Sequence, residues 1–384
     1  MNEPAEQLNP MEGLVPLETP ARLAALRLGM IAGVGPRIRQ VLLEHFGSAE
    51  AVLAAAPSEL RAVPGVGPKL SAAIARSATE IDVAAEIAQC RQHKITLLAA
   101  GEADYPASLA EIPDPPGVLY VRGGLEPRDG LAVAIVGSRH ATQYGLAQAE
   151  RLASSLARAG LTIVSGLARG VDAAAHRGAL AAGGRTLAVL GSGVLNIYPP
   201  EHERLAAEVA AGGALISENS LHAEPFSGSF PQRNRLISGL SLGVIVVEAS
   251  THSGALITAR HALEQGREVF AVPGRVDSRM SHGCHRLLRD GARLVESADD
   301  VLDELGPPVA RVPLPSGEVV HHPAELSLND MERQVLAAIG GSTASIDQVV
   351  TDSGLPTPQV LSTLSVLEMR RLVRRISGNR VMRP

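Results

Sequence analysis

FPQRNRLISGLSLGVIVVEAS, residues 230–250, joins a polar loop, an arginine cluster and an apolar strand in one continuous run. The segment GVIVV near its end is typical of a strand that is buried on both faces. Before it, Arg233 and Arg235 flank Asn234 where the pattern changes from loop to helix, and residues 225–247 contain no Asp or Glu. A helix start offers unpaired amides to an anion, and Phe230 beside guanidinium groups suits a base stacked next to its phosphates. The stretch therefore predicts a polyanion site, and it fits equally a Phe packed under its own loop with two solvated arginines.

Short apolar runs like GVIVV recur along the middle of the chain, separated by Ala-rich helical segments. Strands that alternate with helices form a parallel sheet with helices on both faces. We therefore predict a doubly wound α/β fold with a mainly parallel sheet, preceded by two strands at 95–99 and 118–121. Its main strands are expected at residues 131–136, 161–164, 186–190, 214–217, 244–247, 269–272 and 292–295.

Small and polar residues follow several of these strands, at the edge where such sheets bind ligands. Glycines let backbone amides approach an anion, hydroxyl groups donate to it, and arginines supply charge. We predict a phosphate or nucleotide site where these loops converge, although each Gly-rich turn alone is ordinary strand-to-helix geometry. Asp172 is expected to cap the helix that follows it. The candidate residues are Gly137, Ser138, Arg139, Ser165, Gly166, Arg169, Gly191–Gly193, Ser253 and Gly254.

Several familiar ligand motifs are missing from the sequence. It has no GxGxxG followed about 20 residues later by an acid, no GxxxxGK[ST], no HExxH and no CxxC, so we expect no cofactor, no metal and no catalytic residue set. Three donors crowd into Ser281-His282-Gly283-Cys284-His285, too close for a tetrahedral site, and we expect a loop that caps the next helix. Glu248 at a strand end fits an acid/base, a hydroxyl acceptor or, equally, the cap of a turn.

Composition limits the remaining classes of protein. The 384 residues suggest two or three domains, and the net charge of −5 means that a nucleic-acid site must be a local patch. Two distant cysteines favour a reducing compartment. The acidic N-terminus has no leader pattern and no stretch is long and apolar enough to span a membrane, so we expect a cytoplasmic protein with no membrane partner.

Smaller domains are predicted on both sides of the core, beginning with a flexible tail at residues 1–19. In residues 20–110, GVGP occurs at 33–36 and again at 65–68, each time before a basic residue and a helix. This repeat predicts a helix-hairpin-helix, SAM-like domain whose hairpin amides, with Arg37 and Lys69, can hold a DNA phosphate or serve only as helical packing.

A Pro-rich linker at residues 306–325 leads to three short helices and a hairpin at 326–384, the pattern of a winged helix. Its last part is basic without an acid, so the wing contacts either DNA or protein. The candidate contacts are Arg370, Arg371, Arg374 and Arg375.

Four further motifs surround the opening stretch in a fixed order: AIVGSRHATQYG, SGLARGVDAAAH, VLGSGVLNIYPPEH and SGALITARHALEQGREVFAVPG. With them the sequence resembles the DNA-processing protein A (DprA, or Smf) family over nearly its whole length. The resemblance implies a Rossmann-like core at residues 111–305 that binds single-stranded DNA in natural transformation, forms a homodimer and helps to load the RecA recombinase. It also implies a phosphate loop at 137–139, a base contact by Phe230 after Gly228, and a basic helix start at 233–235.

One position departs from that family. Many relatives carry Lys or Arg three positions before the aromatic residue, where this chain has Ser227 in the run Phe226-Ser-Gly-Ser. Part of the family's charge is therefore missing, and a neighbouring Arg or the outer domains are expected to replace it. We expect binding of single strands to depend on Arg139, Phe230, Arg233 and Arg235, with duplex contacts through the outer domains left open.

Two other functions fit parts of the sequence. Nucleotide phosphoribohydrolases of the lysine-decarboxylase-like fold share this type of sheet, but HSGALITAR stands where their PGGxGT loop would be. A structural hub that binds RecA and no DNA is the other alternative.

Overall fold

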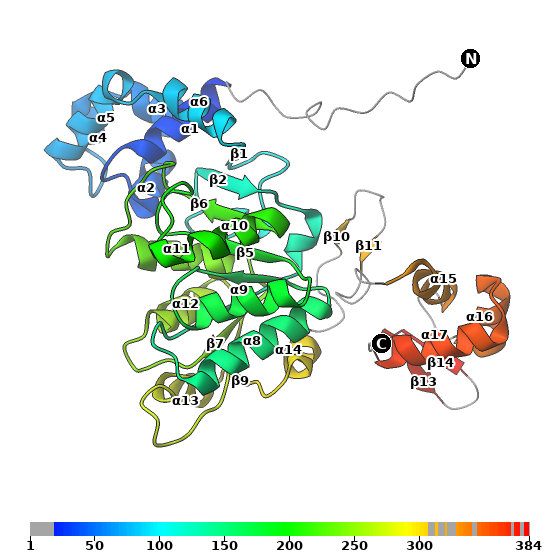
Figure 1. The fold of residues 1–384 in the computed structure, drawn as a ribbon. Helices are drawn as coiled ribbons and strands as arrows, with labels where there is room; N and C mark the ends of the chain where they lie inside the picture. The colour runs from blue at the N-terminus through cyan, green and yellow to red at the C-terminus, as the bar shows by residue number, and fades with distance from the viewer. Residues whose placement is uncertain are drawn as a thin grey trace, which may run out of the picture.

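The computed structural model describes residues 19–305, 312–313, 319–320, 328–339, 344–369, 372–376 and 380–383. The expected tail, apart from Thr19, and most of the expected linker lie outside these ranges. Figure 1 shows the helical N-terminal part against one end of a large sheet with helices on its two faces.

The sheet contains all nine strands that the sequence predicts. Its order is β1-β2-β6-β5-β4-β3-β7-β8-β9; β1 and β2 run antiparallel to each other, β2 runs antiparallel to β6, and all other neighbours are parallel. The chain builds outward from β3 through β4, β5 and β6, then returns to place β7 on the other side of β3. The strands are β1 (Ile95–Ala99), β2 (Val118–Gly123), β3 (Ala132–Gly137), β4 (Thr162–Ser165), β5 (Thr186–Val189), β6 (Ala214–Ser217), β7 (Gly243–Val247), β8 (Glu268–Ala271) and β9 (Arg293–Leu294).

Alternate residues of each central strand enter two different cores. In β7, Val244 and Val246 pack with α11, α12 and α13 on one face, whereas Ile245 and Val247 pack with α8, α9 and α14 on the other. A strand buried on both faces needs apolar residues at every position, which explains the run GVIVV. The helices and 3-10 turns of the core are α7 (Ala107–Ala110), η1 (Pro127–Gly130), α8 (Gln143–Arg158), α9 (Val171–Ala181), η2 (Pro200–His202), α10 (Glu203–Gly212), α11 (Ser229–Gly239), α12 (Gly254–Glu264), α13 (His282–Arg289) and α14 (Ala298–Leu305).

The N-terminal helices form the predicted pair of hairpins. Gly33 and Gly65 take φ angles of 95° and 86°, which a residue with a side chain rarely adopts, and Pro36 and Pro68 begin the helices that follow. Leu26 also packs into a core that includes β1, β2 and α10, so this domain is joined to the sheet. Strand β1 belongs to the sheet although it lies before the expected boundary at residue 110. The helices are α1 (Pro20–Met30), α2 (Pro36–Phe46), α3 (Ala49–Ala54), α4 (Pro57–Leu60), α5 (Pro68–Glu80) and α6 (Val83–Gln92).

The C-terminal part has the predicted winged-helix elements around a core of its own, built from Val335, Val349, Leu364, Val381 and neighbouring apolar residues. No helix in the described ranges is both long and apolar enough to cross a membrane. The remaining elements are β10 (Val312–Pro313), β11 (Val319–Val320), α15 (Asp330–Ile339), β12 (Ala344–Ser345), α16 (Ile346–Ser353), α17 (Thr357–Met369), β13 (Arg374–Ile376) and β14 (Arg380–Met382).

A buried charge network secures the edge of the sheet where β5 begins. The Arg185 guanidinium donates to the Asp129 carboxylate at 2.6 Å, to Glu126 at 3.1 Å and to the Gly212 carbonyl at 3.2 Å. The side chains of Arg185 and Asp129 are both less than a tenth exposed. Because a buried carboxylate without its partner is costly, the network depends on both members.

We expect Arg185→Ala to lower the free energy of unfolding by about 3 kcal/mol, since it leaves the Asp129 carboxylate buried and unpaired. The measurement is the urea midpoint of the intact protein. Arg204→Ala is the control, because Arg204 is 92% exposed and its partner among the described residues is Glu208 one turn away; it should cost less than about 0.5 kcal/mol. Equal midpoints for the two variants would contradict the role of the network.

Candidate nucleic-acid interface

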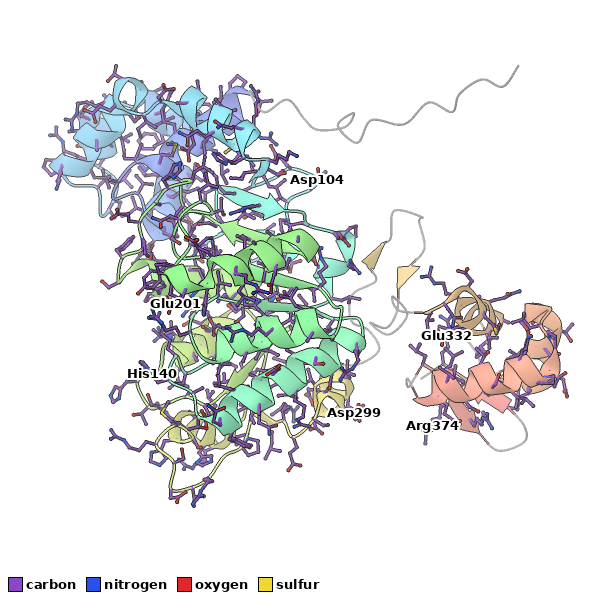
Figure 2. All side chains as sticks on the ribbon, in the orientation of Figure 1. Asp104, His140, Glu201, Asp299, Glu332 and Arg374 are labelled. Carbon is purple, nitrogen blue, oxygen red and sulfur yellow. The ribbon has the colours of Figure 1, made fainter. Side chains whose placement is uncertain are left out.

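Three loops and the first turn of α11 surround a groove at the carboxyl edge of the parallel strands. The groove is a shallow hollow of about 10 Å³, so it cannot enclose a nucleotide and a ligand must lie across it. His140 and Glu201, labelled in Figure 2, mark this edge of the molecule. The lining residues are Arg139, Gly166, Ala168, Arg169, Gly191, Ser192, Tyr198, Pro199 and Phe230.

A cation and two aromatic rings meet in this groove. The guanidinium carbon of Arg139 lies 4.8 Å from the centroid of the Phe230 ring, and the Tyr198 ring lies 5.7 Å from it at a tilt of 45°. Arg139 and Tyr198 are exposed, while Phe230 is half-buried. An exposed positive charge and a half-buried ring are therefore available within one nucleotide's reach of each other.

The glycines of the groove are required by close approach of other groups. A Cβ on Gly166 would lie 2.3 Å from Nη1 of Arg233, and a Cβ on Gly170, whose φ is 75°, would lie 2.2 Å from the Ser138 carbonyl oxygen. A Cβ on Gly191 would lie 3.1 Å from the Phe230 ring. The predicted Gly-rich turns therefore do converge, and they bring backbone rather than side chains to the groove floor.

Helix α11 begins earlier than the sequence indicates. It starts at Ser229, so Arg233, Asn234 and Arg235 lie one turn inside it and are buried. Pro231 is compatible with this start, because the first turn of a helix leaves its amides unpaired in any case. The expectation of a solvent-facing basic helix start at 233–235 is therefore wrong, and the end of α11 that borders the groove belongs to Ser229 and Phe230.

Arg233 lies beneath the groove floor. Its side chain is 4% exposed, and Nη1 donates to the Gly166 carbonyl at 2.7 Å and to the Val189 carbonyl. Burial lowers its pKa to about 10, which leaves the guanidinium charged at neutral pH. A phosphate contact by Arg233 would have to break these bonds, so its substitution tests the floor of the groove more than a contact with a ligand.

Asp172 serves the same floor and does not cap its own helix. Its carboxylate accepts hydrogen bonds from the amides of Gly166 at 3.2 Å and Ala168 at 3.4 Å, which precede α9. Burial raises its pKa, while the nearby charge of Arg233 opposes that shift. Arg233 and Asp172 thus fix the 166–168 turn from below, through its carbonyl and its amides.

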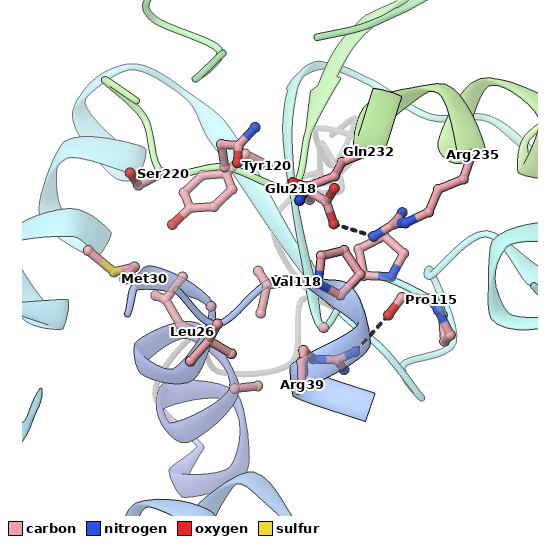
Figure 3. A pocket seen from close by; sticks show the side chains of 18 residues that line it. Leu26, Met30, Arg39, Pro115, Val118, Tyr120, Glu218, Ser220, Gln232 and Arg235 are labelled. Carbon is pink, nitrogen blue, oxygen red and sulfur yellow. Dashed lines mark hydrogen bonds and ion pairs between the residues drawn. The ribbon is translucent and has the colours of Figure 1, made fainter. Parts of the chain in front are cut away.

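Arg235 faces away from the groove, toward the N-terminal domain. Its guanidinium pairs with Asp114 at 3.0 Å and with Glu218 at 2.5 Å. Figure 3 shows Arg235 and Glu218 in a cavity of about 80 Å³ between the helical domain and the core. In the same cavity Arg39 donates to the Pro115 carbonyl at 2.6 Å. Arg235 therefore belongs to the contact between the two parts.

Other predicted residues hold the scaffold of the site. The Ser165 hydroxyl is fully buried and donates its one proton to the Ile135 carbonyl at 2.6 Å, so it cannot donate to a phosphate as expected. The Asn234 amide donates to the Gly254 carbonyl at 3.2 Å. Ser253 caps α12, Gly228 caps α11, and Ser138 accepts a bond from the His140 amide at 3.0 Å.

Glu248 closes the point where the strand order reverses, between β3 and β7. Its carboxylate accepts from the Thr142 amide at 2.7 Å and from the Thr142 hydroxyl at 2.6 Å, at the start of α8. A Cβ on Gly145 would lie 2.3 Å from the same carboxylate. In many doubly wound folds a ligand phosphate occupies this position, and here the protein's own carboxylate does. The interpretation of Glu248 as a cap is correct, and the groove lies to one side, over β4 and β5.

The crowded Ser281–His285 cluster is not a loop as expected: Ser281 is the N-cap residue of α13, without a side-chain cap bond, and residues 282–285 form the first turn of that helix. Burial raises the pKa of the Cys284 thiol to about 11, and its sulfur donates to the Val246 carbonyl at 3.5 Å. His285 contacts the Gly274 carbonyl at 3.0 Å. Among the described residues no three His, Cys, Asp or Glu side chains are grouped to hold a metal ion.

The predicted contacts in the outer domains have different surroundings. Arg37 and Lys69 are exposed, but Gly35 and Pro36 of the first hairpin line the cavity of Figure 3, whereas Gly67 and Pro68 of the second are exposed. Arg374, labelled in Figure 2, is exposed, and Arg375 pairs with Glu368 at 3.3 Å. Arg370 and Arg371 lie outside the described residues.

Sequence reasoning missed Tyr198, which lines the groove, and Glu201, the partner of a groove residue. Tyr198 lies in the turn NIYPPEH and was not singled out. In a chain with only eight Phe and Tyr residues, an aromatic residue in a polar turn indicates a candidate ligand contact. Glu201 pairs with Arg169 at 2.5 Å, and both side chains are about half exposed. No local pattern reveals this pair, since the two residues are 32 positions apart.

Three family models match the chain. Residues 96–306 match DNA recombination-mediator protein A, residues 320–379 match the DprA winged helix domain, and residues 25–80 match a SAM-like helix-hairpin-helix tandem. The predicted order of domains is thereby confirmed.

Known proteins of similar sequence extend this result. Protein Smf of Synechocystis is 35% identical over 93% of this chain and 98% of that protein, and DNA processing protein DprA of Streptococcus pneumoniae is 44% identical over 52% of this chain and 71% of that protein. The crystal structure of the pneumococcal protein matches with a TM-score of 0.63 and 34% identity, over 75% of this chain and 98% of the other.

DNA processing protein A of Helicobacter pylori, whose structure describes that protein's single-stranded DNA binding mode, matches with a TM-score of 0.50 and 33% identity over 55% of this chain and 95% of the other. Together with the match of the recombination-mediator model to residues 96–306, these similarities assign the chain to the DNA processing protein A (DprA/Smf) family.

Proposed function

We propose that this protein binds single-stranded DNA across the groove and delivers it to the RecA recombinase during natural transformation. The observation that carries the proposal is the exposed Arg139 guanidinium lying 4.8 Å from the ring of Phe230 in an open, glycine-floored groove. Two comparisons support it. The chain matches the family model of DNA recombination-mediator protein A, and the structure of the Helicobacter pylori relative describes that protein's binding of single-stranded DNA.

Arg139 and Phe230 would act in sequence as a strand arrives. Arg139 is exposed, so its guanidinium can leave the ring for a phosphate at little cost, and the ring is then free for a base. Arg169 can likewise exchange Glu201 for a phosphate, because exposed ion pairs are weak. A ring stacks only on an unpaired base, so duplex DNA would forgo the stacking energy while keeping the phosphate contacts.

The outer domains would add phosphate contacts and not base contacts. Arg37 and Lys69 lie exposed beside hairpin glycines, and Arg374 lies exposed on the wing. Contacts of this kind carry no sequence information and suit single strands and duplex alike. Their role would be to tune affinity.

We further propose that the protein acts as a homodimer and as a binding protein, not as an enzyme. The family relation supports mediation over catalysis. Strand β9 forms an edge of the sheet, and Leu294 on it is 49% exposed, which is compatible with pairing between two copies.

Phe230→Ala should weaken binding of a single-stranded oligonucleotide about tenfold, because stacking on an aromatic ring contributes roughly 1 to 3 kcal/mol per base. The dependence of affinity on salt should hardly change, since the substitution removes no charge. Fluorescence anisotropy with single-stranded and duplex probes measures both effects. If the variant is folded and binds like the wild type, Phe230 is only part of the core packing.

Arg139→Gln should weaken binding and also reduce the slope of log affinity against log salt by about 0.7 for each phosphate that the side chain no longer neutralises. Arg158→Gln is the matched control, because Arg158 is exposed at the far end of α8 from Arg139. The same titration over a salt series measures both slopes. An unchanged slope for Arg139→Gln would show that this residue holds no phosphate.

Mediation predicts that the wild type speeds the assembly of RecA on DNA coated with single-strand-binding protein. The Phe230→Ala and Arg139→Gln variants should show less of this effect, in proportion to their weaker binding of DNA. The onset of RecA ATPase activity on coated DNA measures assembly. Full binding of DNA without acceleration would contradict mediation, and acceleration without DNA binding would favour a protein hub.

A further inference from the structure

Phe226 is the most exposed aromatic residue that the structure describes, and the groove does not account for it. The sequence contains no Trp, four Phe and four Tyr. Tyr105, Tyr120 and Phe270 are buried, Phe46 is half-buried, and Tyr144 is exposed but donates its hydroxyl to the Pro273 carbonyl at 2.8 Å. The other three rings are Tyr198 and Phe230, which line the groove, and Phe226, which lies four residues before Phe230 and is 57% exposed. A lone exposed apolar residue needs no explanation, but this concentration in a chain so poor in aromatics does.

The chain holds the Phe226 ring in place beside the start of α11. The Ser229 amide and hydroxyl both donate to the Phe226 carbonyl, at 3.0 Å and 2.8 Å, and close a tight turn between the two residues. The Phe226 ring also packs across the turn against Gly228, where a Cβ would lie 2.7 Å from it. The ring is thus supported on one side by backbone and open to solvent on the other.

We propose that Phe226 is a second base-stacking platform, which takes the base next to the one on Phe230. The proposal rests on the proposed binding of single-stranded DNA and extends it. Both rings belong to one short segment of the chain, because the turn at 226–229 runs directly into the helix that carries Phe230. In this proposal the next base of a strand held by Arg139 and Phe230 stacks on Phe226, which the turn at 226–229 joins to the start of α11.

The segment that carries Phe226 has few acidic residues that would repel a phosphate backbone. No Asp or Glu occurs from Pro225 to Val247, and Glu224 is the one acid between Asn219 and Glu248. Stacking tolerates any base, because every base offers a flat face, and it needs no further charge. A second ring would therefore strengthen binding of single strands without increasing its dependence on salt.

The absence of Trp from the sequence permits a direct test. In the full-length Phe226→Trp variant the sole indole reports on this position, and we expect a single-stranded oligonucleotide to quench its fluorescence while a duplex of the same sequence does not. The matched control is Leu263→Trp, because Leu263 is 63% exposed near the end of α12 and far from the carboxyl edge of the strands. Its indole should be unaffected.

Affinity gives a second readout. Phe226→Ala should weaken binding of the single strand about fivefold, with the salt slope and the duplex affinity unchanged, and Phe226→Tyr should restore it. If Phe230→Ala weakens binding while Phe226→Ala does not, and the indole fluorescence of Phe226→Trp stays constant, this inference is overturned and the proposed function stands. If RecA alone quenches the indole, the ring serves a protein partner and the inference also fails. If the wild type binds no single strand, the proposed function itself fails.

Discussion

The buried guanidinium of Arg233 is the constraint on which the groove depends. A charge held at 4% exposure must be surrounded by acceptors, and here they are the Gly166 and Val189 carbonyls at the ends of two parallel strands. Residues three apart on a helix share a face. The bonds that hold Arg233 against these loops therefore also hold Phe230 against them. Asp172 completes the arrangement by holding the amides of the turn whose carbonyl Arg233 holds. The groove floor is therefore rigid because a charge lies beneath it.

The fold could be predicted well from the sequence because its signals are local and repeated. Each central strand is apolar at every position, and each hairpin of the N-terminal domain repeats GVGP before a helix. The junction between these parts could not be predicted in the same way. Strand β1 joins the sheet, and Leu26 of the helical domain packs into the core, so the boundary expected at residue 110 divides elements that share one apolar core.

Several predicted residues do converge in the groove, but the predicted shared role of the arginines does not follow from the structure. The sequence predicts that Arg139, Arg233 and Arg235 act together, yet Arg139 is exposed, Arg233 lies under the floor and Arg235 joins two domains. The difference comes from partners distant in the chain, such as Glu218 and the Gly166 carbonyl, which no local pattern reveals. The same holds for Tyr198, which reaches the groove only because the turn after β5 folds over it.

Glu248 affects which ligands can bind at the carboxyl edge of the sheet. The position at the head of α8, which attracts phosphate in related architectures, is filled by a carboxylate that is 5% exposed and bonded twice to Thr142. The protein's own carboxylate thus takes the bonds that the head of α8 would otherwise offer to a small anion. The hollow beside it, of about 10 Å³, is too small to enclose such an anion and suits a longer ligand that touches several points at once.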